Sequence, residues 1–188
     1  MLPVLRTDTV SAAVAAAEQL VSCGVGVVEL TATTPDWPDG VRALRRDHPD
    51  LLVGLGTVRA PATAGRALDE GVDFLVSPHL VPEVRASTPL PLIEGGWTPT
   101  ELAAATDVGI AKLFPAHVGG PAYLRTLRAV LPDAEIVPTG GIEPGDVEDW
   151  LSAGALAVGL GSSLTRQLTE DPKAVTDWLA GLTDGRAS

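Results

Sequence analysis

Short apolar runs alternate with longer segments of helical pattern along the whole chain. Each run is too short for a helix, and a short apolar run bounded by turn residues is typical of a buried strand. Eight runs are present, and they begin near Leu2, Gly26, Leu51, Asp73, Leu90, Gly109, Ala134 and Ala155. Strand–helix units repeated in this way predict parallel strands joined by helical crossovers.

The segments between the runs carry start and stop signals for helices. Residues 11–22 are rich in alanine, and proline stands in the first turn of the segments 60–70, 98–106, 121–130 and 144–153. Proline is favoured there because its missing N–H has no helical partner to lose. Thr98 and Glu101 have the spacing of a capping box. Glycines at the expected helix ends are Gly24, Gly71, Gly109 and Gly154.

The repeat of eight units predicts a (β/α)8 TIM barrel, with residues 1–188 forming a single domain. An open, doubly wound parallel sheet is the alternative architecture. We find no linker, low-complexity segment or second domain in the pattern. Residues 82–91 are too few for a full helix, so we expect the fourth crossover to be abbreviated.

Composition and charge limit the class of protein. The chain has 188 residues, of which 45% are hydrophobic, and no apolar run approaches the roughly 18 residues that span a membrane. The start of the sequence lacks the pattern of a signal peptide, and the single cysteine, Cys23, suits a reducing cytoplasm. The net charge of −11 argues against nucleic acid or an anionic membrane as a partner.

Lys112 is the most informative single residue. It is one of only two lysines, the other being Lys173, and it stands at the end of the apolar run that begins near Gly109. An amine at a buried strand end can lose its proton and attack a carbonyl. The structural alternative is a lysine whose amine reaches out to solvent from the strand end.

A barrel places its active site at the carboxyl ends of its strands, so the polar residues there are candidates for chemistry. In chain order these residues are Arg6, Glu29, Thr57, Ser77, Glu94, Lys112, Thr139 and Ser162. Glycine-rich segments follow the seventh and eighth runs, at residues 139–141 and 159–163. Barrels frequently bind phosphate with these two loops, although glycine is also common in tight turns.

Several motifs, collinear over about residues 2–165, resemble those of the class I aldolases that act on 2-keto-3-deoxy-6-phosphogluconate (KDPG) and 4-hydroxy-2-oxoglutarate (KHG). The most specific is Lys112-Leu113-Phe114-Pro115, followed by the Pro-Thr-Gly-Gly-Ile segment at 138–142. The other matching segments are 4–6, 28–31, 54–58, 77–80 and 98–102.

The resemblance implies a role for each matching residue. Lys112 corresponds to the Schiff-base lysine and Glu29 to the general acid/base, while Arg6 and Thr57 correspond to positions that hold the pyruvate carboxylate. The phosphate site corresponds to Gly140, Gly141, Gly161 and Ser162, with Thr139 beside them. It also implies a homotrimer that needs neither a metal nor a cofactor, and small-molecule partners: pyruvate with an aldehyde or aldehyde phosphate.

Departures from the family pattern concern the substrate more than the chemistry. Glu94 stands where the family usually has proline, and we expect it to point toward the mouth near Lys112; with Phe114 it is a candidate for substrate specificity. The family's common arginine after strand two is absent, which leaves Arg6 as its substitute. His117 replaces a common glutamate, and a lone loop histidine is usually idle. The helix that usually precedes the first strand is also expected to be missing.

Other functions remain open from sequence alone. A phosphate-binding barrel could be an isomerase or synthase, or a degenerate barrel that only binds a ligand or acts as a scaffold. Within the aldolases, Thr139 before the two glycines resembles the gluconate-type enzymes more than the galactonate-type. The three histidines show no metal-ligand spacing, which argues against a metal-dependent aldolase.

Overall fold

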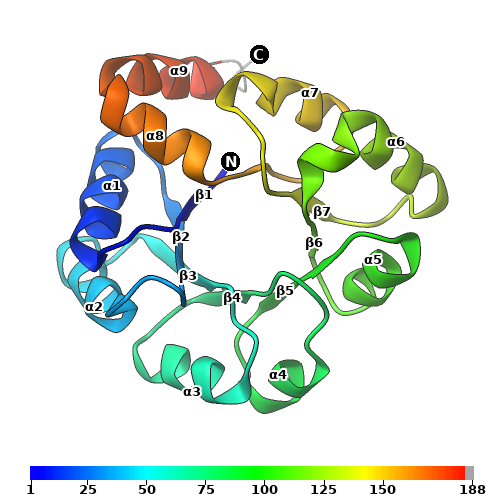
Figure 1. Ribbon diagram of the computed structural model, residues 1–188, viewed down its shortest axis with the longest axis horizontal. Coiled ribbons are helices and arrows are strands. Elements are labelled where there is room, and N and C mark those ends of the chain that lie inside the picture. Colours follow the sequence, from blue (N-terminus) through cyan, green and yellow to red (C-terminus); the bar gives the residue numbers. More distant parts are fainter. Residues whose placement is uncertain (185–188) are drawn as a thin grey trace.

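The computed structural model describes residues 1–184, which form one barrel of parallel strands surrounded by helices (Figure 1). The sheet order is β7-β6-β5-β4-β3-β2-β1-β8. The strands are β1 (Leu2–Leu5), β2 (Val27–Thr31), β3 (Leu52–Gly56), β4 (Phe74–Val76), β5 (Leu92–Gly96), β6 (Ala111–Leu113), β7 (Ile136–Pro138) and β8 (Gly159–Leu160).

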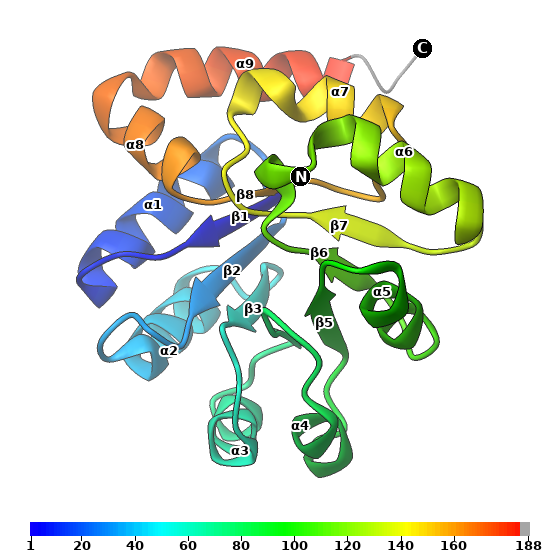
Figure 2. The same cartoon turned by 45° about the vertical axis from the view of Figure 1, so that its right-hand side comes forward.

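The connecting helices lie outside the ring of strands, as both views show (Figures 1 and 2). They are α1 (Val10–Ser22), α2 (Trp37–Asp47), α3 (Pro61–Asp69), α4 (Pro82–Ser87), α5 (Pro99–Thr106), α6 (Gly120–Val130), α7 (Val147–Ser152), α8 (Ser162–Glu170) and α9 (Pro172–Asp184). Short 3-10 turns, η1 (Ala116–Val118) and η2 (Pro144–Asp146), precede α6 and α7.

The ring closes between β7 and β8. Thr139 and Gly159 form a parallel bridge, and the Leu156 amide donates a 2.9 Å hydrogen bond to the Ile136 carbonyl. Gly159 is needed here, because a Cβ at this position would overlap the Thr139 side chain. The close approach of the last two strands therefore depends on a residue without a side chain.

One continuous hydrophobic cluster fills the space inside the ring and between the ring and the helices. Leucine and isoleucine side chains from strands and helices, such as Leu5, Leu55 and Leu124, are fully buried in it. Burial on both faces explains why the strands read as continuous apolar runs rather than as alternating ones. None of the helices within residues 1–184 is both long and apolar enough to cross a bilayer.

The predicted (β/α)8 barrel is confirmed, and the open-sheet alternative is wrong because β7 meets β8. The capping box of Thr98 and Glu101 is present, and α4 is the abbreviated fourth crossover. Two details differ. The helix predicted over 144–153 divides into η2 and α7, and β8 begins four residues after Ala155.

Candidate functional site

Lys112, the middle residue of β6, and Glu29, the middle residue of β2, meet inside the barrel. The Lys112 Nζ lies 3.9 Å from the Glu29 Oε1, and the two side chains are 9% and 1% exposed. Glu29 Oε2 has no hydrogen-bond partner among the described residues. A buried carboxyl oxygen left unpaired is costly, so this atom is a candidate for contact with a substrate or water.

Burial changes the proton affinity of both groups in the direction of the uncharged form. It raises the pKa of the Glu29 carboxyl, an effect that the positive charges of Lys112 and Arg6 oppose. Burial lowers the pKa of the Lys112 amine; Glu29 opposes this effect and Arg6 adds to it. The low polarity of the site thus increases the fraction of Lys112 that is a neutral amine, the form that acts as a nucleophile.

Gly56 provides the space for the Glu29 side chain. A Cβ at residue 56 on β3 would overlap the Glu29 carboxylate, and Glu29 lies opposite Gly54 in the register of β2 and β3. The Gly-Leu-Gly-Thr motif of the sequence is therefore explained by packing at its second glycine.

Arg6 is held by hydroxyl groups from two neighbouring loops. Its Nη2 donates to Thr57 Oγ1 at 3.0 Å, and its Nη1 donates to Thr33 Oγ1 at 3.2 Å. Thr57 has φ = 62°, which is a strained conformation for a β-branched residue. Strain of this kind concentrates at functional sites, where the surrounding structure holds it in place.

A cavity of about 390 Å³ opens beside Lys112. Its predicted lining residues are Arg6, Lys112, Phe114, Thr139, Gly140, Gly141, Gly161 and Ser162, and they are joined by Val4, Glu143, Ser163 and Arg166. Glu29 and Thr57 are not lining residues, but each contacts one: Glu29 lies beside Lys112, and Thr57 accepts a hydrogen bond from Arg6. The structure thus brings together ten of the twelve residues that the sequence nominated; Ser77 and Glu94 are not among the lining residues.

The two glycine loops form one side of this cavity. Gly140 and Gly141 have φ values of 96° and 69°, where a side chain would be strained, and a Cβ on them would press on Phe114 and His117. Gly161 and Ser162 begin α8, whose first amide groups lack helical partners. Amides at a helix start together with exposed loop amides are typical of an anion-binding site.

Glu143 and Arg166 are two charged lining residues that sequence reasoning missed. Arg166 Nη2 lies 3.1 Å from Glu143 Oε2, and both side chains are about half exposed. Arg166 follows Ser162 by four residues and so lies on the same face of α8, which is a signal that the sequence did contain.

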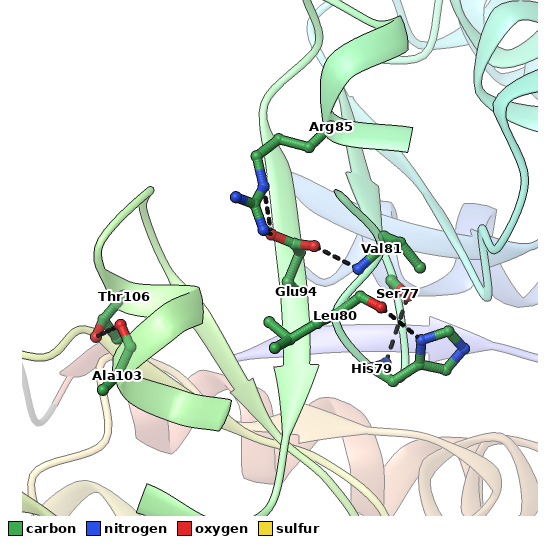
Figure 3. Close-up of polar contacts among 8 residues, drawn as sticks. All are labelled: Ser77, His79, Leu80, Val81, Arg85, Glu94, Ala103 and Thr106. Carbon is green, nitrogen blue, oxygen red and sulfur yellow. Dashed lines mark hydrogen bonds and ion pairs between the residues drawn. The ribbon is translucent and has the colours of Figure 1, made fainter. Parts of the chain in front are cut away.

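Glu94 does not point toward Lys112, and that prediction is wrong. Its Oε1 accepts a 2.6 Å hydrogen bond from the Val81 amide, and its Oε2 pairs with Arg85 at 2.6 Å, both on the α4 side of β5 (Figure 3). The physical reason is strand alternation: Gly95, not Glu94, lies opposite Lys112 in the register of β5 and β6.

The remaining candidates lie near the cavity. Phe114 is 37% exposed, and the centroid of its ring is 5.5 Å from Lys112 Nζ. Thr139 is buried at the closure of the barrel. His117 is not isolated, since its Nδ1 lies 3.2 Å from the Gly140 carbonyl. Within the described part of the chain, no cluster of three or more His, Cys, Asp or Glu side chains could hold a metal.

A barrel whose buried lysine meets a carboxyl beside a cavity lined by glycine loops is typical of enzymes that use a lysine amine as a nucleophile. Sequence comparison identifies the family. The family model described as "KDPG and KHG aldolase" matches residues 1–177. The chain belongs to this family, and the predictions of the family and of an aldolase, a lyase, are confirmed.

Individual relatives agree with this assignment. The KHG/KDPG aldolase of Escherichia coli K12 is 35% identical over 158 residues, which cover 81% of this chain and 74% of that protein. The 2-dehydro-3-deoxy-6-phosphogalactonate aldolase of the same organism is 31% identical over 173 residues, with 88% and 84% covered.

A solved structure is similar over almost the whole chain. The KDPG aldolase of Legionella pneumophila superposes with a TM-score of 0.81 at 28% identity, covering 95% of this chain and 91% of that one. In that crystal structure, pyruvate was captured at low pH as a covalent carbinolamine intermediate.

Proposed function

We propose that this aldolase reversibly cleaves a 2-keto-3-deoxy sugar acid of the KDPG type, or KHG, into pyruvate and an aldehyde through an imine on Lys112. The observation that carries the proposal is the buried Lys112 amine, 3.9 Å from a Glu29 carboxyl that has one unpaired oxygen. No metal or cofactor enters the proposed reaction.

The first stage forms the imine. The neutral Lys112 amine attacks the C2 ketone of the substrate and gives a carbinolamine. The carbinolamine hydroxyl leaves as water after it takes a proton from the Glu29 carboxyl, which burial favours in its protonated form. The resulting iminium draws electrons from the neighbouring carbon–carbon bond.

The second stage breaks the C3–C4 bond. Glu29, now a carboxylate, removes the proton of the C4 hydroxyl directly or through one water. The C4 oxygen becomes the carbonyl of the aldehyde, and the electrons of the C3–C4 bond pass to the iminium and form an enamine of pyruvate. Glu29 then returns its proton to C3, and hydrolysis releases pyruvate and regenerates Lys112.

Arg6 and Thr57 are proposed to hold the carboxylate of the keto acid. The Arg6 guanidinium lines the cavity that contains Lys112, and the hydrogen bonds from Arg6 to Thr33 and Thr57 fix its orientation. An oriented guanidinium binds a carboxylate well because its donors match the spacing of the two oxygens. The carboxylate would thereby place the adjacent ketone next to the amine.

The distal end of the substrate is proposed to lie against the glycine loops. Backbone amides near Gly140, Gly141, Gly161 and Ser162 are suited to a phosphate. We retain the preference for a gluconate-type over a galactonate-type substrate, which rests on Thr139. Phe114 borders the cavity and is proposed to limit the shape of the aldehyde end.

Borohydride trapping with pyruvate tests the proposal at its central residue. The wild type should gain one pyruvyl adduct on Lys112, detected by peptide mass spectrometry, and Lys112→Met should gain none and lose cleavage. Lys173→Met is the matched control, because Lys173 is 83% exposed on α9 and pairs with Asp177. Failure of the wild type to form the adduct would instead support a barrel that only binds a ligand.

Two further expectations belong with the proposal. We propose a homotrimer, for which Val118 and Phe114, exposed at 65% and 37% after β6, offer apolar surface. We also propose the cytoplasm as the location, since a lone cysteine suits a reducing compartment. Analytical ultracentrifugation of the purified protein tests the first.

A further inference from the structure

Among the described residues that line the cavity, Arg166 is the one cationic side chain that does not lie at the reacting end. Lys112 and Arg6 both lie at the reacting end, where the Arg6 guanidinium donates hydrogen bonds to Thr33 and Thr57. Arg166 lines the same cavity from the second turn of α8, together with Gly161 and Ser162 at the start of that helix. In a chain of net charge −11, a local cation of this kind decides whether an anion is accepted.

The partner of Arg166 in the free protein is replaceable. Glu143 Oε1 and Oε2 both accept from a single nitrogen, Nη2, at 3.2 and 3.1 Å. Among the described contacts, the Arg166 Nε and Nη1 groups are not used, so the guanidinium keeps its capacity for a two-point contact. The side chains are 56% and 51% exposed, and exposed pairs of this kind are weak.

We propose that Arg166 is a specificity-determining residue that binds a phosphate group at the distal end of the substrate, in exchange for Glu143. A phosphate carries nearly two negative charges and three acceptor oxygens, so it attracts a guanidinium more strongly than a single carboxylate does. Glu143 holds Arg166 at the rim when the site is empty and repels the phosphate when it enters. This inference rests on the proposed function.

Removing the positive charge of Arg166 and removing the negative charge of Glu143 should have opposite effects on the preference for a phosphorylated substrate. Arg166→Gln should lower the ratio of kcat/KM for KDPG to kcat/KM for KHG by roughly tenfold to a hundredfold, the usual worth of a charge-assisted hydrogen bond. Arg166→Lys, which keeps the charge without the fork, should recover part of the loss. Glu143→Gln should raise the same ratio severalfold, because it removes a negative charge from the rim.

A matched control separates this effect from the general loss of a surface arginine. Arg46→Gln removes an exposed guanidinium paired with Asp47 at the far end of α2, and it should leave the ratio unchanged. Equal losses on both substrates in Arg166→Gln, or a fall of the ratio in Glu143→Gln, would overturn the proposal.

Calorimetric titration with glyceraldehyde 3-phosphate and with glyceraldehyde provides a readout that does not require catalysis. The wild type should bind the phosphate compound more tightly, and Arg166→Gln should remove most of that difference. If pyruvate trapping failed while the wild type still bound glyceraldehyde 3-phosphate more tightly than glyceraldehyde, the proposed imine chemistry would be refuted and the phosphate contact would be supported. If trapping succeeded and the wild type showed no such difference, the imine chemistry would stand and the proposed phosphate contacts, including that of Arg166, would be refuted.

Discussion

At the scale of single residues, the site depends on two ionisable groups that lie where burial destabilises the charged form of each. Lys112 and Glu29 are almost fully buried, and burial shifts both pKa values toward the neutral forms. Their mutual attraction opposes these shifts, but the two groups form no hydrogen bond, since the 3.9 Å between Nζ and Oε1 is too long for one. The pair can therefore exchange protons with a substrate instead of remaining a fixed salt bridge.

Glu29→Gln should slow the cleavage of the C3–C4 bond by about 10²- to 10⁴-fold, the usual contribution of general acid/base catalysis. Trapping of pyruvate on Lys112 should be slower but should still go to completion, because the nucleophile stays in place and water can replace Glu29 in protonating the departing hydroxyl. Single-turnover cleavage and adduct formation should be measured on the same preparation. Loss of both would show that Glu29 acts by tuning the lysine rather than by moving protons at C4.

The pH dependence of trapping should reflect the lowered pKa of Lys112. The neutral amine is lost as the pH falls through this pKa, so the rate of adduct formation should fall on the acid side. Because burial lowers the pKa, that fall should be centred below the ordinary value of 10.5. Glu29→Gln removes an anion that raises the pKa of Lys112, so the midpoint should move to still lower pH. A move toward higher pH would contradict this arrangement.

At the scale of elements, glycines in the strands and loops give the functional side chains their space. Gly56 at the end of β3 leaves room for the Glu29 carboxylate, which comes from β2. The neighbouring atoms belong to the end of a flexible side chain, so an added methyl group would displace Glu29 before it disturbed the backbone.

Gly56→Ala should therefore lower kcat by about 10²-fold, since a displacement of about 1 Å can cost this much. The melting temperature should change little. Gly65→Ala is the control, because a Cβ in the middle of α3 meets nothing within 4 Å and alanine favours the helix. A large fall in melting temperature with kcat preserved would show that Gly56 serves packing alone.

Glu94 links two elements rather than the protein and its substrate. Its carboxylate connects β5 to both ends of α4, through the amide of the N-cap residue Val81 and the guanidinium of Arg85 in the last turn. Glu94 itself is 1% exposed. The short helix α4 has six residues and one fully buried side chain, Val84, so this polar link contributes substantially to its attachment.

Glu94→Gln should lower the free energy of unfolding by about 1–3 kcal/mol, the cost of losing a charged hydrogen-bond partner in a buried place. Urea unfolding measures this change, and Arg85→Gln should show a loss of similar size. The KM values for KDPG and KHG should stay within about twofold of the wild type. A changed KM with unchanged stability would restore Glu94 as a residue that contacts the substrate.

At the scale of the whole molecule, barrel closure makes one site from residues far apart in the sequence. Arg6 follows β1, Lys112 lies on β6 and Arg166 lies on α8, yet all three line the same cavity. Parallel strands bring their carboxyl ends to one face, so each of the βα loops can contribute to that face.

Much of the architecture was predictable from the chain alone. Buried parallel strands need continuous apolar runs, and helices need caps, so the eight runs, Thr98 with Glu101 and the helix-ending glycines revealed the order of elements. The catalytic candidates were predictable too, because position at a strand end and the collinear family motifs both pointed to Lys112 and Glu29.

What the sequence could not determine was the direction in which particular side chains point and what they meet. The start of β5 and its register against β6 decide that Glu94 faces α4, and a shift of one residue reverses the face of a strand side chain. The meeting of Arg166 with Glu143 across the loops of β7 and α8 likewise exists only after the ring closes. Local patterns fix the elements because their causes are local, whereas contacts between distant residues depend on register and closure.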